Sequence, residues 1–532
     1  MKSFNHIVIG AGSSGCVVAG RLSEDPNRRV LLLEAGPPDR SPWIHIPIGY
    51  GKTMWDRRVN WCFETDPDPG VDGRRIYWPR GKTLGGSSSI NGLIYIRGQR
   101  EDYDHWAALG NRHWGFDDVL PLFKRSESNQ RGASEFHGAT GPLRVSDISA
   151  PHELIEAFIA AAADIGVARN DDFNGRHQEG AGYYQLTTHK GWRCSTAAAY
   201  LRPARRRSNL QVACHAQATS LIVEGQRVVG VRYRQHGQDL EARCDGEVIL
   251  SAGAVQSPQL LQLSGIGPAA LLGRVGIPVR HDLAGVGENL QDHLQFRLTY
   301  ACTRPITTND DLNSWFGQAR IGLQWALRRS GPLAVGINQG GCFMSSAASD
   351  GDRPDIQFHV ATLSADMAGA KPHPFSGFTL SVCQLRPTSR GQIQIRSDNP
   401  FEPPSMRPNY LSTELDRVTA VAAVRAARSI ANAPSLRPYV RQELKPGPSA
   451  STDADLLAFC RASGATIFHP SGTCRMGQDA DAVVDDRLRL HGLQGLRVVD
   501  CSIMPTLVSG NTNAAAVMIA EKAVEMMLQD GA

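Results

Sequence analysis

The chain has 532 residues, a net charge of +4 and a hydrophobic content of 41%. This length exceeds one ordinary hydrophobic core and predicts several domain equivalents, and the composition is that of a globular protein. The small net charge argues against a dedicated nucleic-acid-binding protein, so we expect no nucleic-acid partner.

Cysteine usage and apolar runs bear on the compartment. Eleven cysteines are scattered without a CxxC pair or a metal-ligand spacing, which predicts reduced thiols, no metal site and a cytoplasmic protein. The first expected strand begins within four residues of Met1, so we expect no signal peptide. No apolar stretch reaches the roughly eighteen residues of a membrane span, although peripheral membrane contact stays open.

The first predicted elements are a strand, a tight glycine turn and a helix. Apolar residues 7–9 lead into Gly10-Ala-Gly12-Ser13-Ser14-Gly15, and a helix of small residues is expected to reach Leu22. In such a turn the first glycine makes the bend and the second lets backbone N–H groups reach a pyrophosphate. The third lets helix and strand pack closely, and the helix dipole favours the bound anion.

A second strand and an acidic residue complete this pattern. Apolar residues 30–33 end at Glu34, about twenty residues beyond the last glycine, where a carboxylate can bind a ribose hydroxyl. The two strands, the glycine turn and the acid together predict a dinucleotide site.

The later segments continue an α/β pattern. Residues 81–92 form a second glycine-serine loop that offers backbone donors to a flat ring or a phosphate. Residues 246–253 predict a buried parallel strand, and Ser257-Pro258 is expected to cap a short helix through Leu263 with the proline in its first turn.

The C-terminal segment predicts a strand and a helix, whereas the stretches between the cofactor-like segments predict an antiparallel sheet. Residues 496–500 predict another strand, and residues 513–528 predict a helix after a polar turn. Alternating stretches such as residues 392–396 predict an antiparallel sheet with one solvated face.

Five sequence blocks resemble one enzyme family. The chain is similar to the glucose-methanol-choline (GMC) oxidoreductases, and within them to bacterial choline-dehydrogenase-like alcohol dehydrogenases. The blocks occur in family order along the whole chain, at residues 10–36, 80–92, 253–267, 285–293 and 469–513.

The resemblance and the spread of cofactor-like segments predict two domains in a mixed α/β protein. Residues 1–150, 193–296 and 466–532 are expected to form a Rossmann-type FAD-binding domain assembled from discontinuous segments. Residues 151–192 and 297–465 are expected to form a substrate domain with an antiparallel sheet flanked by helices.

The resemblance also implies a cofactor site. FAD would be bound by residues from every block of the nucleotide-binding segments: Gly10, Gly12, Ser13, Ser14, Gly15, Glu34, Ala35, Gly85, Gly86, Asn91, Gly92, Ile94, Ala218, Ala252, Asp500 and Asn513. Some members attach FAD through a histidine in the glycine-serine block. That position is Ile90 here, so we expect non-covalent FAD.

The same resemblance places catalysis at His469 and Asn511. An imidazole has a pKa suited to taking a hydroxyl proton near neutrality, which eases hydride removal from the carbinol carbon. Asn511 would bind the substrate oxygen and orient it. We expect the helix that begins at Asn513 to stabilise reduced flavin through its dipole, or Asn513 to cap that helix. His293, Glu288 and Asp292 are interpreted as structural.

Several functions stay open at this point. The leading hypothesis is an alcohol dehydrogenase that passes electrons to a quinone or another carrier. An oxidase of the same fold would use O₂, a lyase of the family would retain FAD structurally, and an NAD-dependent dehydrogenase would account for the first motif alone. Choline, which needs an aromatic enclosure and a carboxylate, competes with aliphatic, aromatic and polyol alcohols. The oligomeric state is open as well.

Overall fold

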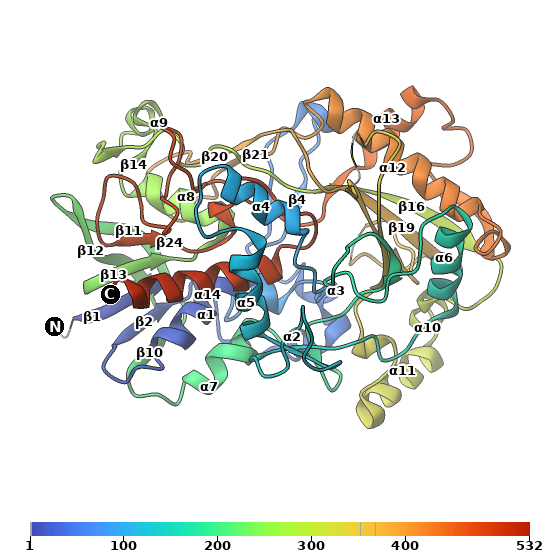
Figure 1. Ribbon diagram of the computed structural model, residues 1–532, viewed down its shortest axis with the longest axis horizontal. Coiled ribbons are helices and arrows are strands. Elements are labelled where there is room, and N and C mark those ends of the chain that lie inside the picture. Colours follow the sequence, from blue (N-terminus) through green and yellow to red (C-terminus); the bar gives the residue numbers. More distant parts are fainter. Residues whose placement is uncertain (1–2, 350, 352, 368, 532) are drawn as a thin grey trace.

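The computed structural model describes residues 3–349, 351, 353–367 and 369–531. Two large sheets organise the fold (Figure 1). The first has the strand order β10-β2-β1-β13-β12-β11, with β24 paired to β13. Its strands are β1 (Phe4–Ile9), β2 (Val30–Leu33), β10 (Leu210–Ala213), β11 (Ala216–Glu224), β12 (Arg227–Gln235), β13 (Gln238–Leu250) and β24 (Leu496–Val498).

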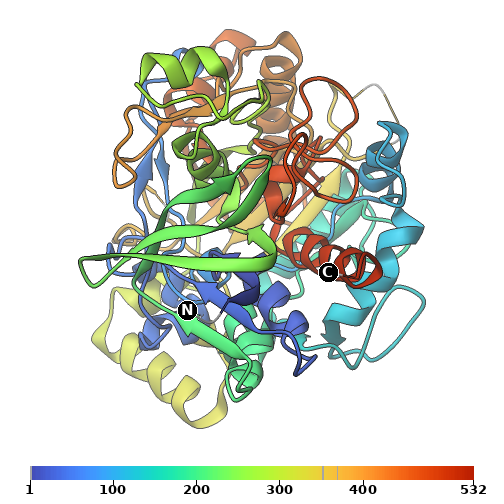
Figure 2. The same ribbon diagram turned by 90° about the vertical axis from the view of Figure 1, so that its left-hand side faces the viewer.

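This first sheet is parallel where the dinucleotide pattern predicted it. β1 pairs in parallel with β2 and with the end of β13, and β24 extends the parallel part. β11, β12 and the start of β13 form an antiparallel meander, which faces the viewer in Figure 2 as long green strands. Helices α1 (Ser13–Leu22) and α14 (Asn513–Gln529) pack against each other. The first and last elements of the chain therefore share one half of the molecule (Figure 1).

The second large sheet is antiparallel, with the order β22-β16-β19-β18-β17-β7 and β23 paired to β16. Its strands are β7 (Gly180–Tyr183), β16 (Leu294–Cys302), β17 (Asn338–Met344), β18 (Ile356–Ala361), β19 (Gly377–Gln384), β22 (Val440–Lys445) and β23 (Ala465–Thr466). Helices α6 (Glu153–Asp164), α12 (Glu414–Asn432) and α13 (Asp453–Ser463) cover one face, on the right in Figure 1.

The alternation of side chains along this sheet separates a core face from a polar face. On β16, Phe296, Leu298 and Tyr300 belong to the buried core beneath the helices, so Gln295 and Arg297 point to the other face because successive side chains alternate. The mixed α/β fold with a parallel nucleotide-binding sheet and an antiparallel second sheet is thus confirmed. The exact domain boundaries stay a prediction.

The remaining elements connect and flank the sheets. The other helices are α2 (Pro42–His45), α3 (Tyr50–Thr53), α4 (Arg100–Ala108), α5 (Phe116–Ser126), α7 (Arg202–Ala204), α8 (Gly253–Leu263), α9 (Ala269–Arg274), α10 (Thr308–Leu312) and α11 (Trp315–Arg328). Small two-strand pairings are β3 (Phe63–Glu64) with β4 (Tyr77–Trp78), β5 (Glu127–Asn129) with β6 (Leu143–Val145), β8 (Thr188–His189) with β9 (Trp192–Arg193), β14 (Ile266–Gly267) with β15 (His281–Asp282), and β20 (Gln392–Gln394) with β21 (Ser405–Arg407).

Two local predictions need correction. α8 begins at Gly253, so Pro258 lies inside the helix and not in its first turn. The helix starts earlier because Asp500 accepts a hydrogen bond from the Gly253 N–H at 2.9 Å, and the Thr473 hydroxyl donates to the Ala254 carbonyl that the proline leaves without its helical donor. β20 is antiparallel as expected, but it pairs with β21 in a separate small sheet.

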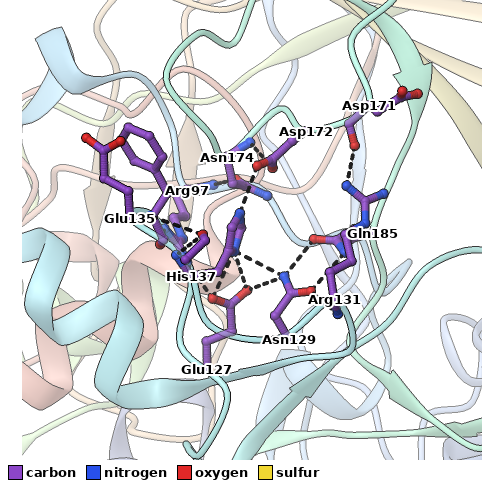
Figure 3. Close-up of polar contacts among 12 residues, drawn as sticks. Arg97, Glu127, Asn129, Arg131, Glu135, His137, Asp171, Asp172, Asn174 and Gln185 are labelled. Carbon is purple, nitrogen blue, oxygen red and sulfur yellow. Dashed lines mark hydrogen bonds and ion pairs between the residues drawn. The ribbon is translucent and has the colours of Figure 1, made fainter.

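A cluster of charged and polar side chains surrounds Glu127 and His137 (Figure 3). The Glu127 carboxylate pairs with Arg97 at 2.7 Å and with Nδ1 of His137 at 3.1 Å. Nε2 of His137 lies 2.9 Å from the Asp172 carboxylate. Burial alone would lower the pKa of His137, but its hydrogen bonds to Asp172 and Glu127 raise it. The cluster ties residues 97–137 to the segment that contains Asp172.

Candidate active site

A cavity of about 330 Å³ is lined by residues of both large sheets. One end is formed by the loop after β1, by Glu34 and by β11, and the other end reaches His469 and the polar face of the antiparallel sheet. The cavity therefore joins the predicted dinucleotide site to the predicted catalytic histidine.

The backbone of the first glycine loop leaves the space that a bound pyrophosphate needs. Gly10 has a φ of +95°, and a Cβ there would lie 2.6 Å from the Ser251 carbonyl. A Cβ on Gly15 would lie 1.8 Å from the Gly10 carbonyl, so only glycine lets α1 approach the strand. At Gly12 the nearest protein atom to a Cβ would be 4.0 Å away. Gly12 itself lines the cavity, so its missing side chain leaves space there for a ligand.

Glu34 lies at the end of β2 on the cavity wall. Its two carboxylate oxygens accept hydrogen bonds from the backbone N–H groups of Ala11 at 3.0 Å and Gly36 at 2.8 Å. Burial raises the pKa of this carboxyl to about 7. A carboxyl that the backbone orients at this position suits a ribose hydroxyl, which can donate to its remaining lone pairs.

The second glycine-serine loop packs directly on the first. The Gly85 N–H donates to the Ala11 carbonyl at 2.7 Å, and a Cβ on Gly86 would lie 2.6 Å from the Gly12 Cα. Asn91 is oriented by Arg193, whose guanidinium donates to the Asn91 side-chain oxygen at 2.7 Å. The two loops thus form one continuous wall of backbone.

The structure brings most of the predicted cofactor residues to this one cavity. Those on its lining are Gly10, Gly12, Ser13, Ser14, Glu34, Ala35, Gly86, Asn91, Gly92, Ile94, Ala218, Ala252, Asp500 and Asn513. Gly15 and Gly85 lie behind the lining, where they allow the close packing described above. The residues present fit a dinucleotide such as FAD: two glycine loops free of side chains, a carboxyl for a ribose and two helix starts.

Those helix starts belong to α1 and α14. The Ser13 hydroxyl donates to the Asn513 side-chain oxygen at 2.9 Å, which holds the two N-termini side by side at the cavity. The alternative in which Asn513 caps α14 is wrong, because Thr512 occupies the cap position and Asn513 is the first helical residue. Two positive helix ends can stabilise negative charge in the cavity.

His469 and Asn511 lie together at the other end. Nε2 of His469 is 3.2 Å from the Asn511 side-chain nitrogen, and both residues line the cavity. The backbone N–H of His469 donates to Asp292 at 2.7 Å, and Asp292 also accepts from Thr466 and Tyr410. Asp292 thus fixes the backbone that carries the histidine, and its structural role stays a prediction.

The contact between His293 and His469 was not expected from the sequence. Its Nδ1 lies 2.9 Å from Nδ1 of His469, and its Nε2 lies 2.8 Å from the Leu385 carbonyl. A carbonyl can only accept, so Nε2 of His293 carries the proton, which leaves Nδ1 of this neutral ring as an acceptor. The pKa of His293 is lowered by burial to about 4, in keeping with a neutral ring.

These two hydrogen bonds of His293, here called the His293 relay, assign the tautomer of His469. Since Nδ1 of His293 accepts, Nδ1 of His469 donates, and Nε2 of His469 is unprotonated and can accept from the Asn511 amide. The amide is oriented by Gln357, which donates to the Asn511 oxygen at 3.2 Å. Burial, and then the neighbouring His293 and His359, hold the pKa of His469 well below its usual value. The site presents a neutral imidazole with its basic nitrogen beside an amide.

His359 was not singled out from the sequence either. This buried residue on β18 lines the cavity, and neither ring nitrogen has a hydrogen-bond partner among the residues that the structure describes. Burial lowers its pKa to about 3. Only the alternation along β18 could have indicated that His359 shares a face with Gln357, and no motif marks that strand.

The described ranges also bear on metal binding and on membrane insertion. Within them, no group of three or more histidine, cysteine, aspartate or glutamate side chains could bind a metal ion. No helix in the same ranges is both long and apolar enough to cross a membrane.

The parallel sheet with its glycine loops, the antiparallel sheet and the imidazole of His469 meet at one cavity. Comparison with known proteins agrees: models of the GMC oxidoreductases match residues 4–295 and 387–520. The chain belongs to the GMC oxidoreductase family, whose members bind FAD.

Three relatives illustrate the similarity. The chain is 44% identical to an alcohol dehydrogenase [acceptor] of Pseudomonas putida over 99% of this chain and 96% of that protein. It is 44% identical to the mitochondrial choline dehydrogenase of Homo sapiens, over 98% and 89% of the two chains. The crystal structure of pyridoxine 4-oxidase from Mesorbium loti superimposes with a TM-score of 0.90 at 32% identity, over 99% of both chains.

Proposed function

We propose that this protein oxidises the CH–OH group of an alcohol to a carbonyl, with FAD as cofactor and His469 as the base. The observation that carries the proposal is the position of Nε2 of His469, which lines the cavity 3.2 Å from the Asn511 side-chain nitrogen and is assigned as unprotonated from the contacts of His293. FAD, when bound, would supply the acceptor for the hydride that leaves the carbinol carbon.

His469 would take the hydroxyl proton. A substrate oxygen that enters beside Nε2 could donate its proton to that nitrogen and accept a hydrogen bond from the Asn511 amide. Such a positioned base contributes about 100- to 10,000-fold to a rate. Loss of that proton and of a hydride from the adjacent carbon converts the alcohol to a carbonyl. The relay through His293 to the Leu385 carbonyl keeps Nε2 free of a proton at rest.

The N-termini of α1 and α14 would stabilise negative charge on the bound cofactor. The N-termini of α1 and α14 meet at the cavity, and their partial positive charge would favour pyrophosphate and added negative charge on the cofactor. Asp500, which is engaged by the Gly253 N–H, lines the same wall.

Binding of FAD without a covalent bond is part of the proposal. Ile90 is buried against Ile44 and Val59 at the cavity and offers no nucleophile. Acid precipitation of the purified protein should release the yellow chromophore to the supernatant. A yellow pellet would overturn this part.

The electron acceptor is proposed to be a quinone or another carrier. The name of the Pseudomonas putida relative specifies an acceptor, whereas the Mesorbium loti structure is an oxidase, so O₂ is the rival. Ile467, two residues before His469, lines the cavity, but one side chain does not decide oxygen reactivity.

An exposed apolar helix supports peripheral membrane contact, where a quinone would be met. On α11 the side chains of Trp315, Phe316, Leu323 and Leu327 are 68%, 68%, 60% and 75% exposed. Arg320 and Arg328 on the same helix are exposed as well. Aromatic and aliphatic side chains with flanking arginines are typical of helices that lie on anionic lipid surfaces.

The test of the reaction type is anaerobic. A panel of alcohols that includes choline, benzyl alcohol and sorbose should contain at least one that bleaches the flavin absorbance without oxygen. No bleaching by any alcohol would contradict the proposal and favour a lyase. Mixing the reduced protein with air-saturated buffer then separates the acceptors: reoxidation within seconds would identify an oxidase.

A further inference from the structure

Near His469, the cavity wall formed by the antiparallel sheet, here called the roof of the substrate end, contains a row of side chains from three neighbouring strands. Arg297 on β16 is paired with Ser381 on β19, and Ser381 is paired in turn with His359 on β18. Residues paired across strands share one face of the sheet. Arg297, Ser381 and His359 all line the cavity, so the guanidinium belongs to the same roof as the unpartnered imidazole.

Arg297, which is partly buried on the cavity wall, differs from the fully buried arginines. Arg97 pairs with Glu127, and Arg497 pairs with Glu247 and Asp530. Arg193 is surrounded by carbonyl oxygens, among them those of Ile44 and Asn91. Arg297 has no hydrogen-bond or ion-pair partner among the residues that the structure describes, and burial lowers its pKa.

A desolvated cation without a counter-ion is costly, and proteins pair such charges. The described lining of the cavity contains two carboxylates, Glu34 and Asp500, and both are engaged by backbone N–H groups at the nucleotide end. The protein itself therefore offers Arg297 no anion at the substrate end, which leaves that part to a ligand.

We propose that the substrate alcohol carries a carboxylate, and that Arg297 binds it. The inference rests on the proposed alcohol oxidation. A guanidinium can bind a carboxylate through two parallel hydrogen bonds. Tyr50 adds a second donor at the same end: its hydroxyl accepts from the Ile337 N–H at 3.2 Å, and burial raises its pKa to about 12, so it keeps its proton.

The geometry separates the two ends of this substrate. Arg297 and His359 stand on strands two apart, which places their backbones about 10 Å from each other. His359 and Gln357 share β18, and Gln357 contacts the Asn511 amide at the base. A substrate bound by Arg297 and His469 at once would therefore carry its carboxylate and its carbinol on different parts of the molecule. Choline, a cation, would meet a like charge.

The first test compares two alcohols that differ in one charge. Purified holoenzyme is mixed anaerobically with 4-(hydroxymethyl)benzoate or with 4-methylbenzyl alcohol, and flavin reduction is followed. We expect kcat/KM to be about 100-fold higher for the carboxylate, in line with a charge-assisted hydrogen-bonded pair. Equal or greater efficiency with the neutral alcohol or with choline would overturn the inference while leaving alcohol oxidation intact.

Variants then locate the effect. Arg297→Gln should lower kcat/KM for 4-(hydroxymethyl)benzoate about 100-fold more than it lowers kcat/KM for 4-methylbenzyl alcohol, and Arg297→Lys should retain part of the preference for the carboxylate. Arg304→Gln is the matched control, because Arg304 is exposed, lies just beyond β16 and pairs with Glu153. An equal loss with both alcohols in Arg297→Gln would show that Arg297 serves the cofactor, which contradicts the inference.

A binding measurement is independent of turnover. Benzoate, which has no hydroxyl to oxidise, should perturb the flavin absorbance of the oxidised holoenzyme with a Kd about 100-fold lower than in Arg297→Gln. Benzamide should show no such difference. If benzoate binds both proteins equally, the carboxylate subsite is refuted. If benzoate binds through Arg297 but no alcohol bleaches the flavin, the failure lies in the proposed oxidation and not in the subsite.

Discussion

Nδ1 of His293 lies 2.9 Å from Nδ1 of His469, so one ring must donate and the other must accept. The Leu385 carbonyl at 2.8 Å from Nε2 of His293 decides which, since it forces His293 to accept at Nδ1. A backbone oxygen behind the site thus determines which nitrogen of His469 is free to act as a base toward the cavity.

The pH dependence of flavin reduction follows from that arrangement. His469 has a lowered pKa, caused first by burial and then by His293, so it stays a neutral base below its usual 6.5. The rate of anaerobic flavin reduction should be flat from pH 6.5 upward to the limit set by other groups, and it should fall only at lower pH. An acid limb of the rate profile with its midpoint above pH 6.5 would contradict a lowered pKa of His469.

Replacement of His293 should shift that profile. His293→Leu removes both the acceptor for Nδ1 of His469 and one cause of its lowered pKa, so the acid limb should move to higher pH and kcat should fall more than KM rises. In His293→Asn the side-chain oxygen can replace Nδ1 as acceptor and should restore part of kcat. Identical profiles in His293→Leu and the unmodified protein would remove the relay from the account.

Alanine substitutions at Gly12 and Gly15 of the first loop should have different effects, one on FAD binding and the other on fold stability. In Gly12→Ala the new Cβ meets no protein atom closer than 4.0 Å but enters the cavity, so FAD binding should weaken about tenfold or more with apoprotein stability unchanged. In Gly15→Ala the Cβ would lie 1.8 Å from the Gly10 carbonyl, which should destabilise the fold by about 1–3 kcal/mol. Flavin titration and thermal unfolding of the apoproteins measure the two effects. Gly273→Ala, with open space around it, is the control.

The buried cluster around His137 should set a pH window for stability. The raised pKa of His137 stabilises the fold at low pH, and this part is lost as pH rises through the folded value. The pKa values of Glu127 and Asp172 are lowered despite burial by their hydrogen bonds to His137, and their contribution is lost as pH falls through the folded values. His137→Gln should cost about 1–3 kcal/mol near pH 6 and less at pH 9. An equal loss of thermal stability at both pH values would refute the charged pairing.

The exposed face of α11 should bind anionic lipid. Trp315→Ser combined with Leu327→Ser removes two side chains that are 68% and 75% exposed, so co-sedimentation with phosphatidylglycerol vesicles should fall several-fold with turnover on soluble dyes unchanged. Leu415→Ser, at a 48% exposed position on α12, is the control. Equal sedimentation of all three proteins would argue against this surface.

Much of the fold and of the nucleotide end could be predicted from the sequence, because local patterns determine them. The turn from Gly10 to Gly15 and the strand that ends at Glu34 are short-range signals, and the structure has both elements. The start of α8 is earlier than its local sequence predicts, because the carboxylate that accepts from the Gly253 N–H belongs to Asp500, at the far end of the chain.

The substrate end could be predicted less well. Arg297 and His359 belong to ordinary strand sequences, and only the register of β16, β19 and β18 brings them onto one face. His293 sits in a polar segment whose contact with His469 spans 176 positions. Such juxtapositions depend on tertiary pairing, which residue spacing does not encode.

The proposed reaction depends most on His469 as the base that takes the alcohol proton. The most direct measurement is stopped-flow reduction of the flavin by a reactive alcohol without oxygen, in the unmodified protein and in His469→Ala at equal FAD content. The variant should retain FAD and reduce it about 100- to 10,000-fold more slowly. If the variant keeps FAD and reduces it at a near-normal rate, His469 is not the base.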